Sequence, residues 1–188
     1  MAAVLPCAAR AKKPAKSKKS HKTSSRHHKK SEREVVVHHT YDQAFGTDSV
    51  SADNLITFAQ NLLGTRYRSA TSDPDRGFDC SGFVSYVFKN FNFNVPRSSG
   101  EFIDVGEKVS YEEAKPGDIV IFTSPTNRHR IGHVGIVYSN TSDDFKFIHS
   151  TSGKEHSVTI TTMDDTYKRR FVQVVRLLKK NDVILASR

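Results

Sequence analysis

Tryptophan is absent from this chain of 188 residues, and cysteine and methionine occur only twice each. Cys7 lies near the N-terminus, so the rest of the chain contains Cys80 alone and no disulfide can hold a core together. No apolar run approaches the roughly 20 residues of a transmembrane helix, and no internal repeat is present. We therefore expect a domain without disulfides, without a transmembrane segment and without repeat architecture.

Acidic residues are missing between Arg10 and Lys30, a segment that contains ten Lys or Arg residues. The rest of the chain contains 19 basic and 20 acidic residues, so this segment accounts for the net charge of +9. A Lys-rich segment with few apolar residues cannot form a core, and we expect residues 12–50 to be a basic, then polar, disordered linker. A solvated linker is the simpler interpretation, and an arm that contacts anionic polymers or lipid head groups is the alternative.

Residues 1–11 are apolar and end in Ala9-Arg10-Ala11, a pattern typical of signal-peptidase sites. Because no basic residues precede the apolar run, we interpret the segment as the remnant of a signal sequence. Val4-Leu5-Pro6-Cys7 faintly resembles a lipoprotein-processing site, but the proline argues against lipidation of Cys7. The predicted organisation is a targeting segment at 1–11, a linker at 12–50, one domain at 51–178 and a tail at 179–188.

The most informative stretch is Asp79-Cys80-Ser81-Gly82-Phe83, which places a cysteine where a helix should begin. Apolar residues follow at the spacing of one buried helical face, namely Phe83, Val84, Val87, Phe88 and Phe91. Asp79 is a good N-cap for that helix. The first turn of a helix favours an anion. A thiol placed there can therefore have a lowered pKa and act as a nucleophile. The alternative is that Cys80 is a small buried hydrophobic residue.

A cysteine nucleophile needs a base, and two later histidines are suitably placed. His133 lies in a β-branched, apolar run at 131–138, and His149 lies in a second short strand at 145–150. One strand histidine could accept the thiol proton while the second fixes its tautomer. Each histidine alone would more simply be a core or surface residue, but the order Cys, His, His favours a catalytic set.

The elements expected for residues 51–178 predict an α+β fold. A helical stripe contains Leu55, Phe58, Ala59, Leu62 and Leu63, with Ser51 or Asp53 as its cap and Gly64 as its stop. After the Cys80 helix come strands expected at 118–122, 133–139, 145–150, 158–162 and 171–178. Helices followed by consecutive strands with short turns indicate an antiparallel sheet of about five strands packed against the N-terminal helices.

At this point the chain resembles the NlpC/p60 family of papain-like cell-wall cysteine endopeptidases over roughly residues 51–178. The matching motifs, in order, are Gly64-Thr65-Arg66-Tyr67, Asp79-Cys80-Ser81-Gly82-Phe83-Val84, Pro96-Arg97-Ser98-Ser99, Lys115-Pro116-Gly117-Asp118-Ile119-Val120-Ile121-Phe122, Gly132-His133-Val134-Gly135-Ile136-Val137 and Phe147-Ile148-His149-Ser150. The region between Tyr67 and Cys80 departs from the common pattern, because it lacks the Gly-rich, Trp-containing segment of many members.

The resemblance implies Cys80 as nucleophile, His133 as general base and His149 as the residue that orients it. It places Tyr67 beside the thiolate, where its hydroxyl could help hold the oxyanion with the backbone N–H of Cys80. The implied reaction is hydrolysis of a peptidoglycan stem peptide between γ-D-glutamate and meso-diaminopimelate or lysine. It further implies a monomeric enzyme without cofactor, exported to the bacterial cell envelope, whose basic arm could touch anionic envelope polymers or lipid.

Several other residues have two interpretations. Arg97 could bind a substrate carboxylate or form a structural salt bridge with an acid of the domain, and Asp79 and Ser81 flank the nucleophile where substrate could contact them. The histidines at 27, 28, 38 and 39 lack cysteine or carboxylate partners at ligand spacing, so we expect no metal site. Asp164-Asp165 is more typical of a helix cap than of a catalytic carboxylate pair.

Two other classes of function stay open from sequence alone. One is a non-hydrolytic wall-binding protein, which the presence of all three expected catalytic side chains disfavours. The other is a nucleic-acid binder that uses the Lys-rich arm. The near-neutral charge outside that arm argues against nucleic acid as a partner.

Overall fold

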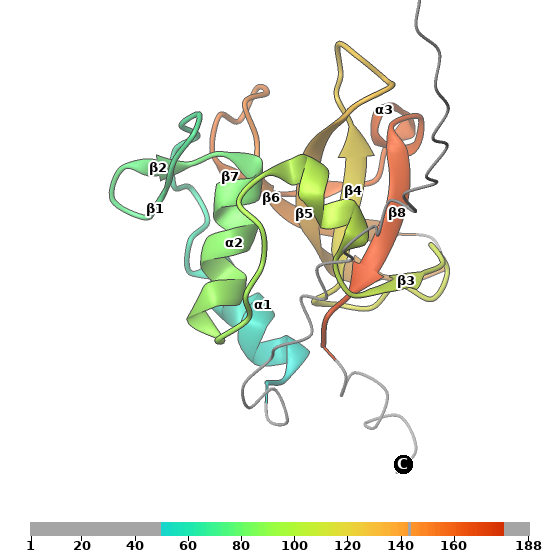
Figure 1. Cartoon of the computed structure of the whole chain (residues 1–188), viewed down its shortest axis with the longest axis horizontal. Coiled ribbons are helices and arrows are strands. Elements are labelled where there is room, and N and C mark those ends of the chain that lie inside the picture. Colours follow the sequence, from blue (N-terminus) through green and yellow to red (C-terminus); the bar gives the residue numbers. More distant parts are fainter. Residues whose placement is uncertain (1–49, 143, 179–188) are drawn as a thin grey trace, which may run out of the picture. The chain divides into compact units, whose positions relative to one another are not determined.

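The computed structural model describes residues 50–142 and 144–178, and its central element is an antiparallel sheet (Figure 1). The six strands of this sheet lie in the order β3-β8-β4-β5-β6-β7. Their bounds are β3 Glu107–Val109, β4 Ile119–Thr123, β5 Ile131–Asn140, β6 Phe145–Ser150, β7 Val158–Thr162 and β8 Phe171–Arg176. The predicted α+β class is confirmed, whereas the prediction of about five strands is wrong by one.

The additional strand is β3, at the edge of the sheet. It has only three residues, and its register pairs Glu107 with Arg176 and Val109 with Val174 of β8. Glu107 and Lys108 are exposed, and Val109 is half-buried. Three residues of this composition are too few to show the alternation of apolar and polar side chains that is typical of a strand. This segment is a strand because it pairs with β8, not because of its own strand propensity.

The α-helices begin at capping side chains, whereas the 3₁₀ helix has no side-chain cap. These elements are α1 Ala52–Gln60, α2 Cys80–Asn90, the 3₁₀ helix η2 Ser99–Asp104 and α3 Asp165–Lys168. Ser51, rather than Asp53, caps α1, because its side chain accepts a hydrogen bond from the N–H of Asn54. Asp164 caps α3 in the same way, as predicted. Between α1 and α2 lies a small hairpin of β1 Ser72–Asp73 and β2 Gly77–Phe78.

Apolar side chains pack on both faces of the sheet. On one face α1, α2 and η2 bury Leu55, Phe83 and Phe102 against strand residues such as Ile121 and Ile136. On the other face a second cluster forms from Val120, Phe122, Val137, Phe145, Phe147, Met163 and Val174. Since neighbouring strand residues point to opposite faces, β4 and β5 supply both clusters and are buried on both sides.

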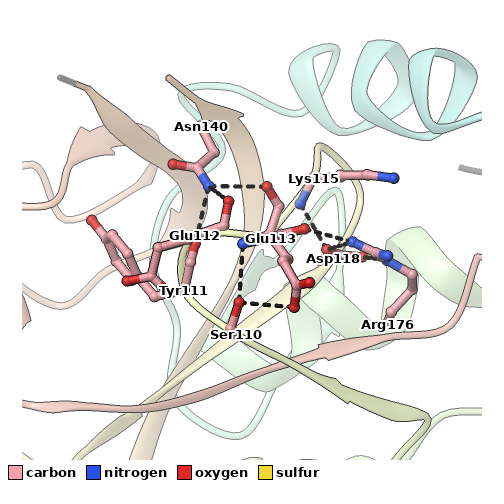
Figure 2. Close-up of polar contacts among 9 residues, drawn as sticks. Ser110, Tyr111, Glu112, Glu113, Lys115, Asp118, Asn140 and Arg176 are labelled. Carbon is pink, nitrogen blue, oxygen red and sulfur yellow. Dashed lines mark hydrogen bonds and ion pairs between the residues drawn. The ribbon is translucent and has the colours of Figure 1, made fainter. Parts of the chain in front are cut away.

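A buried ion pair ties β8 to the turn before β4. Arg176 donates from Nε and Nη2 to the two carboxylate oxygens of Asp118, each at 2.9 Å (Figure 2). Asp118 is fully buried, and its Oδ2 also accepts the N–H of Lys115. Nearby, the Asn140 amide donates to three backbone carbonyls of the turn 111–114 (Figure 2). These contacts hold the start of β4 against its neighbours.

Several predictions fall outside the described residues. They concern the signal remnant at 1–11 with Cys7, nearly all of the linker at 12–50, and the tail at 179–188. Within residues 50–142 and 144–178, no helix combines the length and the apolar character needed to span a bilayer.

Candidate active site

Cys80 is the first residue of α2, as the sequence predicts, and Asp79 is the N-cap. The Asp79 carboxylate accepts the N–H of Gly82 at 2.7 Å. Glycine is required at position 82 because an added Cβ would lie 2.2 Å from the carbonyl oxygen of Thr71. The loop before the helix therefore presses against its first turn, which fixes where the half-buried thiol lies.

Arg97 reinforces this helix start from the loop after α2. Its guanidinium donates to both oxygens of Asp79, at 2.9 Å and 2.7 Å, and to the hydroxyl of Ser81 at 3.0 Å. Ser81 is buried and also lies within hydrogen-bond distance of Asp79. Of the two interpretations of Arg97, the salt bridge within the domain is the one observed.

The two histidines meet on adjacent strands. His133 of β5 and His149 of β6 are buried, and His133 Nε2 lies 2.7 Å from His149 Nδ1. His149 Nε2 lies 2.9 Å from Thr161 Oγ1 of β7, so a polar chain runs across three strands. Gly135 makes room for this chain, because a Cβ there would lie 2.9 Å from the Phe147 ring and 3.2 Å from the His149 Cβ.

The thiol lies against β5 beside His133. The backbone N–H groups of Val134, which follows His133, and of Ser81 and Cys80 itself lower the pKa of the thiol. Among the described residues no hydrogen bond joins the thiol to the His133 ring. Within residues 50–142 and 144–178, the two histidine rings are therefore in contact with each other, and neither ring is hydrogen-bonded to the thiol.

Burial controls the protonation of these groups. It raises the pKa of the Cys80 thiol, and the Asp79 carboxylate adds to that rise, while the surrounding N–H groups lower it. The lowered thiol pKa expected from the helix start is thus outweighed by burial. Burial also lowers the pKa of His133 well below its ordinary 6.5 and that of His149 to about 3, with Arg170 adding to both effects. Both imidazoles are therefore neutral at pH 7.

Tyr67 is half-buried and close to Cys80. Burial raises the pKa of its hydroxyl, and the nearby Cys80 and Asp79 add to the rise. Its ring packs against His156 at 5.4 Å between centroids, and its N–H donates to the His156 carbonyl. The hydroxyl therefore stays a neutral donor within electrostatic reach of the thiol, which is the state needed to stabilise an oxyanion.

Two polar residues near the histidines were not predicted. Thr161 is part of a β-branched strand in which threonine is unremarkable, so only the contact with His149 marks it. Arg170 ends the basic run Lys168-Arg169-Arg170, which is typical of exposed sequence, yet its side chain is half-buried beside the Tyr167 ring. Within the described residues no group of three His, Cys, Asp or Glu side chains could hold a metal ion.

The profile of the NlpC/P60 family matches residues 64–176, more than half of the sequence. The chain belongs to the NlpC/P60 family. This membership confirms the resemblance drawn from the motifs around Cys80, His133 and His149.

Curated relatives of this NlpC/P60 chain are enzymes by name. A gamma-DL-glutamyl hydrolase of Bacillus subtilis is 36% identical over 122 residues, covering 64% of this chain and 28% of that protein. A probable endopeptidase NlpC homolog of Haemophilus influenzae is 34% identical, with coverage of 62% and 57%. The murein DD-endopeptidase MepS/murein LD-carboxypeptidase of Escherichia coli K12 is 33% identical, with coverage of 63% and 58%. The chain thus spans less than two thirds of each of these relatives.

Solved structures show the same fold. An NlpC/P60 family protein from Bacillus cereus superposes with a TM-score of 0.62 at 29% identity, covering 69% of this chain and 41% of that chain. The NlpC/p60 domain of the peptidoglycan hydrolase SagA gives a TM-score of 0.56 at 26% identity, covering 68% of this chain and all of that domain.

Proposed function

We propose that this domain is a thiol hydrolase that cuts the amide between γ-D-glutamate and a diamino acid in peptidoglycan stem peptides. The observation that carries the proposal is the thiol at a helix start beside the strand of His133, whose ring contacts His149 at 2.7 Å. A nucleophile, a base and a residue that orients the base are the parts that thiol-mediated acyl transfer needs.

In the proposed first step His133 accepts the thiol proton as the Cys80 sulfur attacks the amide carbonyl. Burial raises the pKa of the thiol and lowers that of His133, so both groups are neutral before substrate binds. The His133–His149 contact uses Nε2 of His133, so Nδ1 is the nitrogen that would accept the thiol proton. In the matching tautomer His133 Nε2–H donates to His149, and His149 Nε2–H donates to Thr161.

The tetrahedral intermediate then collapses to a thioester. Its oxyanion would be held by the N–H of Cys80 at the helix start, with the Tyr67 hydroxyl as second donor. The His133 imidazolium protonates the leaving amine as the C–N bond breaks. Water attacks the thioester with His133 as base, and the thiol leaves with the proton that His133 returns.

The identity of the amide bond that is cut has less support than the thiol mechanism. The gamma-DL-glutamyl hydrolase relative favours a γ-glutamyl bond, whereas MepS is named for DD-endopeptidase and LD-carboxypeptidase activities. Mass spectrometry of products from stem peptides and from crosslinked muropeptides distinguishes these bonds, because each releases a fragment of different mass.

The proposal is tested with Cys80→Ala and Cys80→Ser. Both variants should abolish hydrolysis of the stem peptide while circular dichroism and unfolding remain near those of the wild type. Retention of more than about a hundredth of the wild-type turnover would exclude Cys80 as nucleophile, since loss of a nucleophile costs several orders of magnitude. A protein that binds sacculi but cuts nothing would instead be a wall-binding module.

We extend the proposal to the rest of the chain. A peptidoglycan hydrolase acts in the cell envelope, and the Ala-x-Ala pattern at 9–11 agrees with export. The segment 10–30, with ten Lys or Arg and no acid, would then add electrostatic attraction to anionic envelope polymers or lipid.

A further inference from the structure

Arg170 lies at the end of the sheet that carries the general base. Phe122 of β4 pairs with His133 of β5 on one side and with Phe171 of β8 on the other. Arg170 immediately precedes Phe171 and is hydrogen-bonded to Thr123 at the end of β4. The Arg170 carbonyl accepts the N–H of Thr123 at 2.8 Å, and Arg170 Nε donates to the Thr123 carbonyl at 2.9 Å. The side chain is therefore held in place before any substrate arrives.

The guanidinium lies over the Tyr167 ring, which contacts the rings of both histidines. Its central carbon lies 5.4 Å from the centroid of the Tyr167 ring. That ring is in turn 6.1 Å from the His133 ring and 5.8 Å from the His149 ring. The positive charge is close enough to lower the pKa of both imidazoles and to interact with the Cys80 thiolate.

Arg170 has no carboxylate partner among the described residues, unlike the other half-buried arginines of the domain. Arg97 and Arg176 each bind both oxygens of one aspartate. Asp164, whose charge acts on Arg170, uses a carboxylate oxygen to cap α3. Burial lowers the pKa of Arg170, so the guanidinium is partly desolvated without a counter-ion. Such a fork-shaped donor is suited to a carboxylate brought by a ligand.

The position of Arg170 within electrostatic reach of His133 indicates which part of the substrate it meets. His133 is the proposed proton donor to the leaving amine, and that amine belongs to the diamino acid. meso-Diaminopimelate carries a side-chain carboxylate that lysine lacks. We propose that Arg170 is a specificity-determining residue that binds this carboxylate and selects diaminopimelate over lysine on the leaving side of the scissile bond. This inference rests on the proposed function.

The test uses three tetrapeptides, L-Ala-γ-D-Glu-X-D-Ala, in which X is meso-diaminopimelate, its side-chain carboxamide, or L-lysine. Wild-type protein should cut the free carboxylate with a kcat/KM about 10- to 100-fold above the other two, the range of a charge-assisted hydrogen bond. Arg170→Gln should lose most of that selectivity, because its kcat/KM should fall far more on the free-carboxylate peptide than on the carboxamide and lysine peptides. Arg169→Gln, which changes an exposed neighbour, should keep the selectivity.

Each remaining outcome overturns the inference. Equal losses on all three peptides would mean that Arg170 serves the histidines or the fold, and unchanged selectivity would mean that it does not contact this group. A D-isoglutamine peptide, in which the α-carboxylate of glutamate is replaced by an amide, tests the other side of the bond. If Arg170→Gln lost its discrimination between this peptide and the glutamate peptide, Arg170 would bind the glutamate α-carboxylate instead. If wild-type protein cuts none of the γ-linked peptides, the proposed function itself fails, and the inference with it.

Discussion

Arg97 holds both carboxylate oxygens of Asp79, and Asp79 caps the helix that begins with Cys80. The Asp79 charge contributes to the raised pKa of the thiol. The guanidinium therefore has two effects: it fixes the capping rotamer and it compensates a negative charge next to the Cys80 thiol. A substrate-binding role for Arg97 would require this bidentate pair to open.

The first prediction separates these roles with Arg97→Gln. Because Asp79 would lose its counter-ion, the thiol pKa should rise further, and alkylation of Cys80 by iodoacetamide should slow at neutral pH. The measurement is the alkylation rate as a function of pH, with Lys89→Gln at the exposed end of the same helix as control. An unchanged alkylation profile together with a raised KM would instead support a substrate-binding Arg97.

The second prediction separates the histidines. His133→Ala should reduce kcat by about 10²- to 10⁴-fold, the contribution of a general base. His149→Ala should cost less, and His149→Gln less again, because an amide oxygen can still accept the His133 N–H. Steady-state kinetics on the stem peptide are the measurement. Greater damage at His149 than at His133 would reverse the two assigned roles.

The third prediction concerns stability in acid. His149 has a pKa of about 3 in the folded protein and near its ordinary 6.5 when unfolded, so the unfolded chain binds more protons between these values. The contribution of His149 to the unfolding free energy is complete above pH 6.5 and declines as the pH falls. At about pH 5 it should be lower by about 2 kcal/mol than at neutral pH. Urea unfolding at several pH values should show this decline in wild type and a shallower one in His149→Gln. Equal slopes would show that His149 is not held neutral by the fold.

The fourth prediction concerns the Asp118–Arg176 pair shown in Figure 2. Asp118→Asn removes the negative charge of a fully buried residue that binds Arg176, whose side chain is only 13% exposed, and should cost about 3 to 5 kcal/mol of unfolding free energy. The double change Asp118→Leu with Arg176→Met should cost much less than the sum of the single changes. The exposed pair Asp144–Lys146 provides the control, because Asp144→Asn should leave the unfolding midpoint nearly unchanged.

The parts of this fold that the sequence predicts are those with a strong local pattern. The helix at Cys80 combines a capping aspartate with a regular apolar stripe, and β4 and β6 are apolar runs bounded by turns. β3 could not be predicted, because only its hydrogen-bonded pairing with β8 makes it a strand. Likewise, the need for glycine at position 82 depends on the Thr71 carbonyl, a contact made by folding of the preceding loop.

The candidate site divides in the same way. Cys80, His133 and His149 can be found from residue type and order, because few other arrangements use these side chains. Thr161 and Arg170 could not be found, since their significance lies in contacts across strands that no spacing in the sequence encodes. The raised thiol pKa is also a property of the assembled site, because it follows from burial under neighbouring elements rather than from the helix start.

The fifth prediction concerns the basic arm. Deletion of residues 1–40 should leave kcat/KM on a small soluble stem peptide unchanged, because every motif of the proposed site follows Ser51. The same deletion should weaken binding to sacculi or anionic vesicles, and the difference should shrink as salt approaches ~0.5 M, where screening shortens the reach of charge.

A full-length variant with the Lys and Arg residues of 10–30 replaced by Gln is the matched control for that deletion, since it keeps the length and removes the charge. It should bind as weakly as the deleted protein if charge is the cause. If the deletion lowered activity on the soluble peptide, the arm would be part of the fold or of the site. The boundary of the catalytic domain would then have to move toward the N-terminus.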